Sequence, residues 1–249
     1  MKGIKYIYPL TLLATFAIFT FMGDILFNYK ATGISVTTAN PQYTYLSPYV
    51  ELSHYDKHFR EAADTLGYDW TLIAAIAYTE SRFDSTAVSE VGACGVMQMM
   101  PKTLRGFGVP DSLHMDNRTN IMTAAKLLET LEWQYRHIGN KEERIKFVLA
   151  SYNAGFGHIL DAMRLAHKHG KDKHTWNENV DSFLVYKSKP EFFNDTLCRN
   201  GEFKDWKQTL AFVNKVHKTW RRFEKKQQNY KDSIDSVIAQ DTLKLIMQL

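Results

Sequence analysis

The sequence is poor in several features that define other classes of protein. Only two of its 249 residues are cysteines, Cys94 and Cys198, and they lie far apart. This spacing excludes the paired ligand motifs of zinc sites and the cysteine-dense frameworks of small secreted domains. A disulfide between the two is one interpretation, and two separate thiols are the favoured one. With only six prolines and few alternating apolar runs, the chain favours a mainly helical fold.

An excess of charge of one sign is also missing. The chain has 31 Lys and Arg against 27 Asp and Glu, for a net charge of +4. This mild excess comes with no nucleic-acid-binding motif, so we expect no nucleic-acid partner. We expect no cofactor and no metal either. The basic cluster at residues 218–226 is interpreted as a solvated helix face, although a mild positive balance also suits an anionic polymer such as a cell wall.

A hydrophobic segment opens the chain. Lys2 and Lys5 precede the apolar run 7–22, which residues 25–27 extend. Basic residues before an apolar run are typical of an export signal or a signal anchor, and the extended run approaches the roughly 20 residues that span a bilayer. We therefore expect residues 1–27 to form an uncleaved signal anchor, with a removed signal peptide as the alternative. In both cases the body of the protein is exported.

The rest of the chain divides into three parts. Residues 28–54 are rich in Thr, Asn, Tyr and Pro without a period, which predicts a tether. Residues 55–226 are expected to form one helical domain, and residues 227–249 a polar C-terminal tail. Within the domain, apolar spacing predicts helices at about 55–66, 70–81, 118–137 and 142–153, one from near 158, one at 206–226, and a short one opened by Pro101. The stretch 171–205 is expected to be irregular.

Glu80 is the most informative single residue. It lies on the last turn of a strongly apolar predicted helix, among Leu72, Ile73, Ile76 and Tyr78. Apolar surroundings raise the pKa of a carboxylic acid, because they disfavour its charged form. A carboxyl group that stays protonated near neutral pH can donate a proton to a leaving group. Considered alone, a surface glutamate is the simpler interpretation, and the motifs that follow reverse it.

Two motifs resemble those of the lytic transglycosylases. The first is ESRF at 80–83 followed by GACGVMQMMP at 92–101, and the second is ASYNAG at 150–155. They occur in the family's order, with helical sequence between them. The arrangement is similar to the catalytic module of the membrane-bound lytic transglycosylase F type, without its ligand-binding domain, for which residues 28–54 are too short. The resemblance implies a mainly α, goose-type lysozyme-like catalytic domain and peptidoglycan glycan strands as substrate.

The resemblance also implies the chemistry of Glu80. As an acid, this residue would protonate the oxygen of the β-1,4 bond between N-acetylmuramic acid and N-acetylglucosamine. As a base, it would then take the proton of the muramoyl C6 hydroxyl, which closes a 1,6-anhydro ring without water. Ordinary glycosidases need a second carboxylate. Asp84 and Glu90 are the nearest in sequence, and both are interpreted as solvated loop charges.

The remaining site residues also follow from the resemblance. Ser89 would orient Glu80 or the muramoyl acetamido group, with a turn-forming serine as the alternative. Gln98 would bind sugar hydroxyls through both the donors and the acceptor of its amide. Met100 would line the groove, whereas Met97 and Met99 are expected in the core. Tyr152 would reach toward Glu80 and the reacting sugar, with simple packing as its alternative. Asn153 is expected to give polar support beside the substrate.

The last predicted helix departs from the family's pattern. Its Glu-Thr-x-x-Tyr-Val motif is matched here by Gln208, Thr209, Leu210, Ala211, Phe212 and Val213, so a carboxylate and a phenol are absent. This change predicts fewer polar contacts to sugar on one side of the groove.

Three functions remain open at this point. The favoured one is a lytic transglycosylase in the periplasm, held at the membrane through residues 1–27 or exported by a signal peptide. The second is a lysozyme-like hydrolase that uses water, and the third is a non-catalytic wall-binding protein of an envelope assembly whose partners are unknown.

Overall fold

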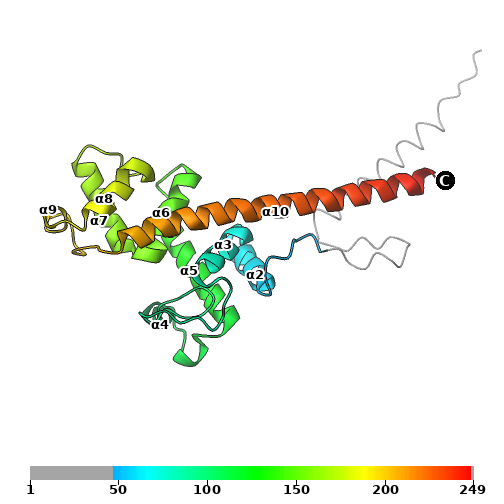
Figure 1. The fold of residues 1–249 in the computed structure, drawn as a ribbon, viewed down its shortest axis with the longest axis horizontal. Coiled ribbons are helices and arrows are strands. Elements are labelled where there is room, and N and C mark those ends of the chain that lie inside the picture. Colours follow the sequence, from blue (N-terminus) through cyan, green and yellow to red (C-terminus); the bar gives the residue numbers. More distant parts are fainter. Residues whose placement is uncertain (1–46, 248–249) are drawn as a thin grey trace, which may run out of the picture. The chain divides into compact units, whose positions relative to one another are not determined.

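The computed structural model describes residues 47–247, and these residues are mainly helical (Figure 1). The helices in chain order are α2 (Asp56–Leu66), α3 (Trp70–Ser81), α4 (Pro101–Gly106), η1 (Asp111–Leu113), α5 (Asn117–Gln134), α6 (Lys141–Ala154), α7 (Phe156–Lys168), η2 (Trp176–Val180), α8 (Asp181–Tyr186), α9 (Pro190–Phe193) and α10 (Trp206–Met247). Within the described residues no strand forms, and two isolated bridges join Val88 to Cys94 and Cys94 to Met99. The predicted mainly helical class is confirmed.

Local chemistry sets the helix ends. The Asp69 side chain accepts a hydrogen bond from the backbone N–H of Thr71, so it caps α3. Gly67 ends α2 with a φ of 68°, a left-handed conformation that glycine adopts without strain. Asn140 caps α6 by accepting from the N–H groups of Glu142 and Glu143. The helices around the motifs therefore begin and end within a few residues of their predicted positions.

The chain forms two compact units. Residues 51–225 make up one unit, and the described part of the other comprises residues 47–50 and 226–247. Every residue of both motifs lies in the 51–225 unit.

The core of the 51–225 unit is built around α3. Every residue from Trp70 to Ala77 is buried, so this helix is apolar on all sides, as expected for a helix inside a domain. Helix α2 packs against both α3 and α5, and α6 packs against α5 and α7. Glu80 thus sits where a fully buried helix reaches the surface.

The expectation of an irregular stretch at 171–205 was wrong. It contains η2, α8 and α9, and it buries the side chains of Trp176, Val180, Phe183, Leu184 and Lys187. Of these short helices, η2 and α8 pack on α7 as well as on each other. Because helices of four to six residues show little periodicity, the sequence pattern did not reveal them.

The helix predicted to end near Lys226 instead continues to Met247. Residues 227–247 contain no proline or glycine, so no helix-breaking residue stops the helix. The predicted segment 1–27 and the part of the predicted tether before residue 47 lie outside the described residues. Across residues 47–247, no helix combines the length and the hydrophobicity that a membrane crossing requires.

Candidate active site

Glu80 lies on the last turn of α3, partly exposed after eight buried residues. Burial raises the pKa of its carboxyl group to about 8. Among the described residues, its side chain accepts and donates no hydrogen bond. A carboxyl group with this pKa and no partner is mostly protonated at neutral pH, so Glu80 is poised to donate a proton.

The end of α3 is fastened to the loop that follows it. Arg82 adopts a left-handed conformation with a φ of 55° and turns the chain out of the helix. The Ser81 hydroxyl donates to the backbone oxygen of Val96 at 2.8 Å. Ser81 therefore ties the turn that carries Glu80 to the second half of the first motif. Ser81 was not predicted as a site residue, although its position directly after Glu80 pointed to such a role.

Tyr152 approaches Glu80 from α6. Burial, with the nearby charge of Glu80, raises the pKa of the Tyr152 phenol well above its ordinary value. Its hydroxyl donates to the backbone oxygen of Met97 at 2.8 Å and lies 3.4 Å from the sulfur of Met99. The structure thus brings Glu80 and Tyr152 together, and the phenol stays neutral and fixed in position.

Ser89 forms a tight turn. Its hydroxyl oxygen accepts from the backbone N–H of Ala93 at 2.9 Å, and its own N–H donates to the oxygen of Ala93 at 2.8 Å. Gly92, with a φ of 84°, allows the turn. The turn-forming interpretation is confirmed, and the hydroxyl proton of Ser89 remains able to donate to a further acceptor.

The side-chain amide of Gln98 forms hydrogen bonds within the loop that the sequence did not indicate. Its side-chain nitrogen donates to the backbone oxygens of Ala87 and Gly95, both at 3.0 Å. Both donors of the amide are therefore used within the loop, and the binding of sugar by Gln98 stays a prediction. The loop carbonyls need these donors, so only the side-chain oxygen of Gln98 is left for a ligand.

The three methionines of the first motif divide as predicted. Met97 and Met99 are buried, whereas Met100 is 41% exposed. Met100 occupies the position before Pro101, the first residue of α4. Its thioether is thus held at the surface by the start of a helix.

Helix α10 lies against the second motif. The Thr209 hydroxyl donates to the Asn153 side-chain oxygen at 2.8 Å. The ring of Phe212 is nearly parallel to that of Tyr152, with a centroid distance of 6.3 Å. Thr209 and Phe212 are buried, and Gln208 is exposed. The match of residues 208–213 to the family's last motif is therefore consistent with their position beside Tyr152.

Asn120 is a second residue of the site that was not predicted from the sequence. This fully buried side chain of α5 donates to the backbone oxygens of Cys94 and His114, both at 3.1 Å, and accepts from the N–H of Met97 at 2.9 Å. A Cβ atom at Gly95 would lie 2.7 Å from the Asn120 side-chain nitrogen. Asn120 thus fixes the backbone of the first motif through hydrogen bonds, and it lies so close to Gly95 that a side chain at that position would not fit.

The other carboxylates near Glu80 in sequence lie at the surface. Asp84 and Glu90 are exposed. Hydrogen bonds from Thr86 lower the pKa of Asp84, which keeps it charged. Both are loop charges, as predicted. Among residues 47–247, no three His, Cys, Asp or Glu side chains are grouped as they would be to hold a metal ion.

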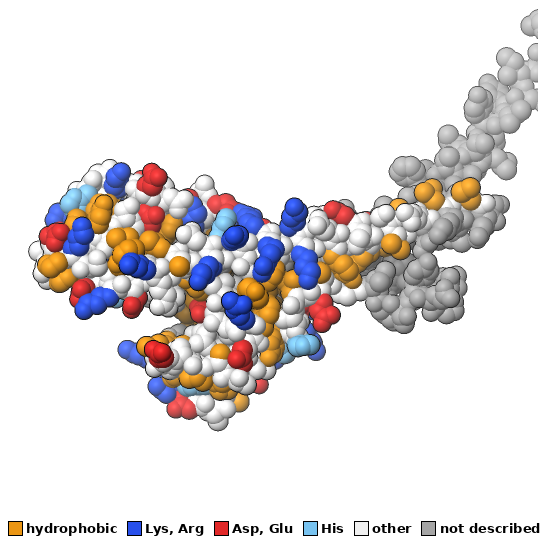
Figure 2. Space-filling view, in the orientation of Figure 1, with side chains coloured by type: hydrophobic (Ala, Val, Ile, Leu, Met, Phe, Trp, Pro, Cys, Tyr) orange, Lys and Arg blue, Asp and Glu red, His pale blue; other side chains and the backbone are white. Residues whose placement is uncertain are grey.

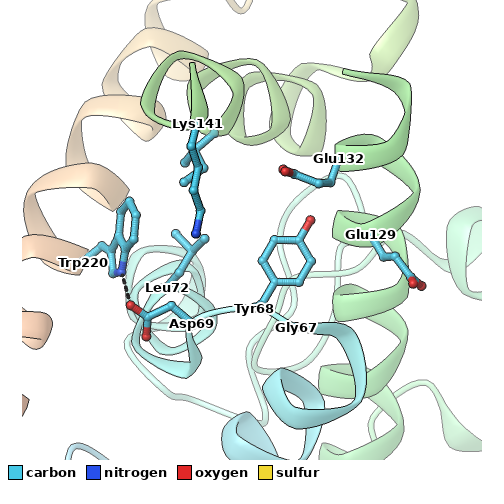
Figure 3. Close-up of a pocket in the computed structure, with 9 residues that line it drawn as sticks. Gly67, Tyr68, Asp69, Leu72, Glu129, Glu132, Lys141 and Trp220 are labelled. Carbon is cyan, nitrogen blue, oxygen red and sulfur yellow. Dashed lines mark hydrogen bonds between the residues drawn. The ribbon is translucent and has the colours of Figure 1, made fainter. Parts of the chain in front are cut away.

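A separate cavity of about 110 Å³ lies near the start of α3, at the opposite end of that helix from Glu80 (Figure 3). It is lined by Leu72 and Trp220, with Tyr68, Glu132 and Lys141 around it. Trp220 donates from its indole nitrogen to Asp69 at 3.1 Å, as the dashed line in Figure 3 marks. None of the predicted site residues lines this cavity.

Comparison with known proteins identifies the region of the motifs. Residues 57–175 match the family model described as the transglycosylase SLT domain. A membrane-bound lytic murein transglycosylase F of Desulfosudis oleivorans is 35% identical over 148 residues, which cover 59% of this chain and 32% of that protein. A protein of the same name from Maricaulis maris is 38% identical over 127 residues, 51% of this chain and 27% of that protein. The chain thus spans about a third of the length of these relatives.

A solved structure of lytic transglycosylase Slt from Pseudomonas aeruginosa overlaps 70% of this chain and 24% of that one, with 22% identity and a TM-score of 0.45. The resemblance to lytic transglycosylases predicted from the two motifs is confirmed by the family match.

Proposed function

We propose that this chain, whose residues 57–175 match the transglycosylase SLT domain, is a lytic transglycosylase of peptidoglycan. It would cleave the β-1,4 bond between N-acetylmuramic acid and N-acetylglucosamine and leave a 1,6-anhydromuramoyl end. The observation that carries this proposal is the state of Glu80, a carboxyl group with a pKa of about 8 at the surface end of a buried helix. Its neighbour Tyr152 supports the same assignment.

In the first step Glu80 acts as an acid. Its proton passes to the glycosidic oxygen, the bond from that oxygen to the muramoyl C1 breaks, and positive charge develops on the sugar ring. A raised pKa suits this step, because the acid form is then present at the working pH. The resulting Glu80 carboxylate lies close to the developing charge and stabilises it.

In the second step the same residue acts as a base. The Glu80 carboxylate takes the proton of the C6 hydroxyl while O6 bonds to C1, which closes the anhydro ring and restores the acid. The reaction consumes no water and needs no second carboxylate, in keeping with the exposed positions of Asp84 and Glu90.

The surrounding residues would hold the sugar. Tyr152 supports the transition state beside Glu80 with a neutral phenol, and Ser89 donates its free hydroxyl proton to the acetamido group or to Glu80. Gln98 accepts from a sugar hydroxyl through its side-chain oxygen. Met100 supplies an apolar contact in the groove, and Asn153, fixed by Thr209, supplies polar support.

Two other functions make different predictions. A hydrolase on the same fold would release muropeptides with reducing ends, because water would replace the C6 hydroxyl. A non-catalytic wall-binding protein of the envelope would release neither product and would keep its role when Glu80 is changed. The uncharged, partnerless state of Glu80 favours catalysis over the second alternative, since a carboxyl group is costly to bury without a function.

We place the enzyme in the cell envelope, with its catalytic domain in the periplasm and residues 1–27 as a membrane anchor or export signal. The names of the relatives, which describe membrane-bound murein transglycosylases, support this location. Peptidoglycan is then the partner that the catalytic domain meets.

The test is a digestion of purified sacculi followed by mass spectrometry. The wild-type chain should release anhydromuropeptides, and Glu80→Gln should release none. Glu90→Gln, a change of the same kind at an exposed loop position, should retain full activity. If only reducing muropeptides are released, the protein is a hydrolase instead. If Glu80→Gln keeps its activity, Glu80 is not the catalytic acid.

A further inference from the structure

The part of α10 within the 51–225 unit carries a row of cations on one face. Lys207, Lys215, Lys218, Arg222 and Lys225 are all exposed. At about 100° per residue these five fall within an arc of about 80°, and at 1.5 Å per residue they extend over about 27 Å. Figure 2 shows Lys and Arg side chains along α10 on the viewed side of the molecule. We call these five residues the basic face of α10.

The basic face contains no acidic residue. Ala211 is the one other residue of positions 207–225 within this arc, and Gln208 and Asn214, about 20° beyond its two edges, are uncharged. The acidic residue Glu224 lies on another side of the helix, where it pairs with Arg221. Like charges gathered without intervening acids repel one another, so the face carries a local positive potential.

The cations of this face are not consumed by ion pairs. Among the described residues, Lys215, Lys218 and Lys225 pair with no carboxylate. Lys207 lies 5.3 Å from the centre of the Trp206 ring, and the Arg222 guanidinium lies over the ring of Tyr78 at 5.3 Å. These aromatic contacts leave the positive charge unneutralised, so the face keeps its capacity to bind anions.

The basic face points away from the proposed site. The contacts of α10 with the site come from Thr209 and Phe212, which meet Asn153 and Tyr152. These residues lie about 140° to 200° around the helix from Lys207, so they are about 130° from the middle of the basic face. Of the five cations, Arg222 contacts Tyr78 of α3, whereas the four lysines lie on a different side of the helix from the residues that meet Tyr152 and Asn153.

The chain that leads to the predicted anchor joins α10 close to this face in sequence. The Gln227 side chain donates to the backbone oxygen of Pro48 at 2.9 Å and accepts from the N–H of Val50 at 3.1 Å. Gln227 follows Lys225 by two positions. The predicted anchor, residues 1–27, precedes Pro48 in the same chain.

We propose that the basic face of α10 docks on the anionic phospholipid headgroups of the bilayer that residues 1–27 enter. This inference rests on the proposed envelope location. A flat row of cations matches a surface of phosphates, and such a contact strengthens with each lysine near the surface. The anchor supplies the second attachment that a weak electrostatic contact needs.

Docking of this kind would orient the enzyme. With the basic face on the bilayer, the side of α10 that contacts Tyr152 and Asn153 is turned away from the lipid. The groove then faces the space where the cell wall lies. The stem peptides of the wall also carry carboxylates, but a bound glycan is expected on the side of the helix that meets Tyr152 and Asn153, which favours the membrane as the occupant of the basic face.

The experiment measures lysine acetylation by mass spectrometry on the full chain reconstituted in vesicles. Vesicles of phosphatidylglycerol mixed with phosphatidylcholine are compared with vesicles of phosphatidylcholine alone. The exposed lysines Lys57, Lys126 and Lys171 serve as internal controls. We expect acetylation of Lys207, Lys218 and Lys225 to slow by about fivefold in the anionic vesicles, and salt to abolish the protection, while the controls do not change.

Two triple variants sharpen the result. In Lys207→Glu/Lys218→Glu/Lys225→Glu, the protection of Lys215 should disappear. In the control Lys57→Glu/Lys126→Glu/Lys171→Glu, which changes the net charge equally, it should remain. A melting temperature equal to that of the wild type establishes that each variant is folded, and the salt dependence in the wild type tests the proposal without any substitution.

Three results would overturn the proposal: equal acetylation in both kinds of vesicle, protection that the control triple variant also loses, or protection that needs purified sacculi instead of anionic lipid. The last would assign the face to the wall polymer. Acetylation does not depend on glycan cleavage, and Glu80→Gln should give the same pattern. A failure to form anhydromuropeptides would therefore refute the proposed enzyme and leave this result standing.

Discussion

Asp161 and Lys187 form an ion pair in which neither side chain is exposed, with the ammonium donating to the carboxylate at 2.7 Å. The same carboxylate accepts from the backbone N–H groups of Arg199 and Asn200 at 3.1 and 2.9 Å. One side chain of α7 thus fixes both α8 and the segment that leads into α10. The segment that carries Thr209 to the site is held through this pair.

Removing the cation of this pair should be costly. Lys187→Met leaves the buried Asp161 carboxylate with the partly exposed Arg164 as its remaining cation, and we expect it to lower the free energy of unfolding by about 3 kcal/mol. Urea denaturation measures the change. Lys204→Met, which removes an exposed partner of Glu202, should cost less than about 1 kcal/mol. If the two substitutions lower the free energy of unfolding equally, the buried pair does not contribute more to stability than the exposed one.

The rate of cleavage should depend on the protonation of Glu80. Because its pKa is about 8, kcat/KM should fall about tenfold per pH unit above that value, since the acid form is lost. Initial rates of anhydromuropeptide release across pH give the profile. A rate that stays constant well beyond pH 8, or that falls already near the ordinary pKa of glutamate, would contradict this assignment.

The stability of the fold should depend on the same group. The pKa of Glu80 is raised on folding, so the native state binds more protons and loses stability as the pH rises from the ordinary range to about 8. Glu80→Gln has no such loss. The free energy of unfolding of Glu80→Gln minus that of the wild type should therefore be about 2–4 kcal/mol larger at alkaline pH than at acid pH. A difference that does not change with pH would indicate a solvated carboxylate.

Gly157 should not tolerate a methyl group. A Cβ atom there would meet the Asn200 side-chain oxygen at 2.4 Å, whereas one at Gly139 would meet nothing. Gly157→Ala should cost about 1–3 kcal/mol, because Asn200 must leave its hydrogen bond to the oxygen of Gly157. Gly139→Ala is the matched control, and thermal unfolding compares the two. The prediction fails if Gly157→Ala and Gly139→Ala have the same melting temperature.

Asn120 should be a positioning residue for the first motif. Asn120→Ala removes three hydrogen bonds from buried backbone groups, so we expect a loss of about 2–4 kcal/mol in stability. At temperatures below the melting transition, the rate of anhydromuropeptide release should also fall. The pH above which this rate declines should stay near 8. Thr130→Ala removes an exposed hydrogen bond on the same helix and should change neither quantity.

Much of this molecule could be predicted from its sequence where the signal was local. Helix α3 was placed at its observed bounds because its apolar run is long and Asp69 caps it. The burial of Met97 and Met99 and the exposure of Met100 followed from the motif. The catalytic role of Glu80 remains a prediction, supported by its raised pKa.

What could not be predicted depends on contacts between distant segments. Nothing around Asn120 in the sequence shows that it meets Cys94 and Met97, and nothing around Gln98 shows that its donors are needed by Ala87 and Gly95. The short helices within 171–205 were missed for a similar reason, since they depend on packing against α7 and on the pairing of Lys187 with Asp161. Tertiary contacts, more than local periodicity, decide these positions.

Cys94 and Cys198 are the only cysteines of the chain, and both are free thiols. Cys94 is buried, and its sulfur faces the backbone oxygen of Met99 at 3.4 Å. The fold therefore owes nothing to oxidation. Thiol reductants should accordingly leave its stability unchanged.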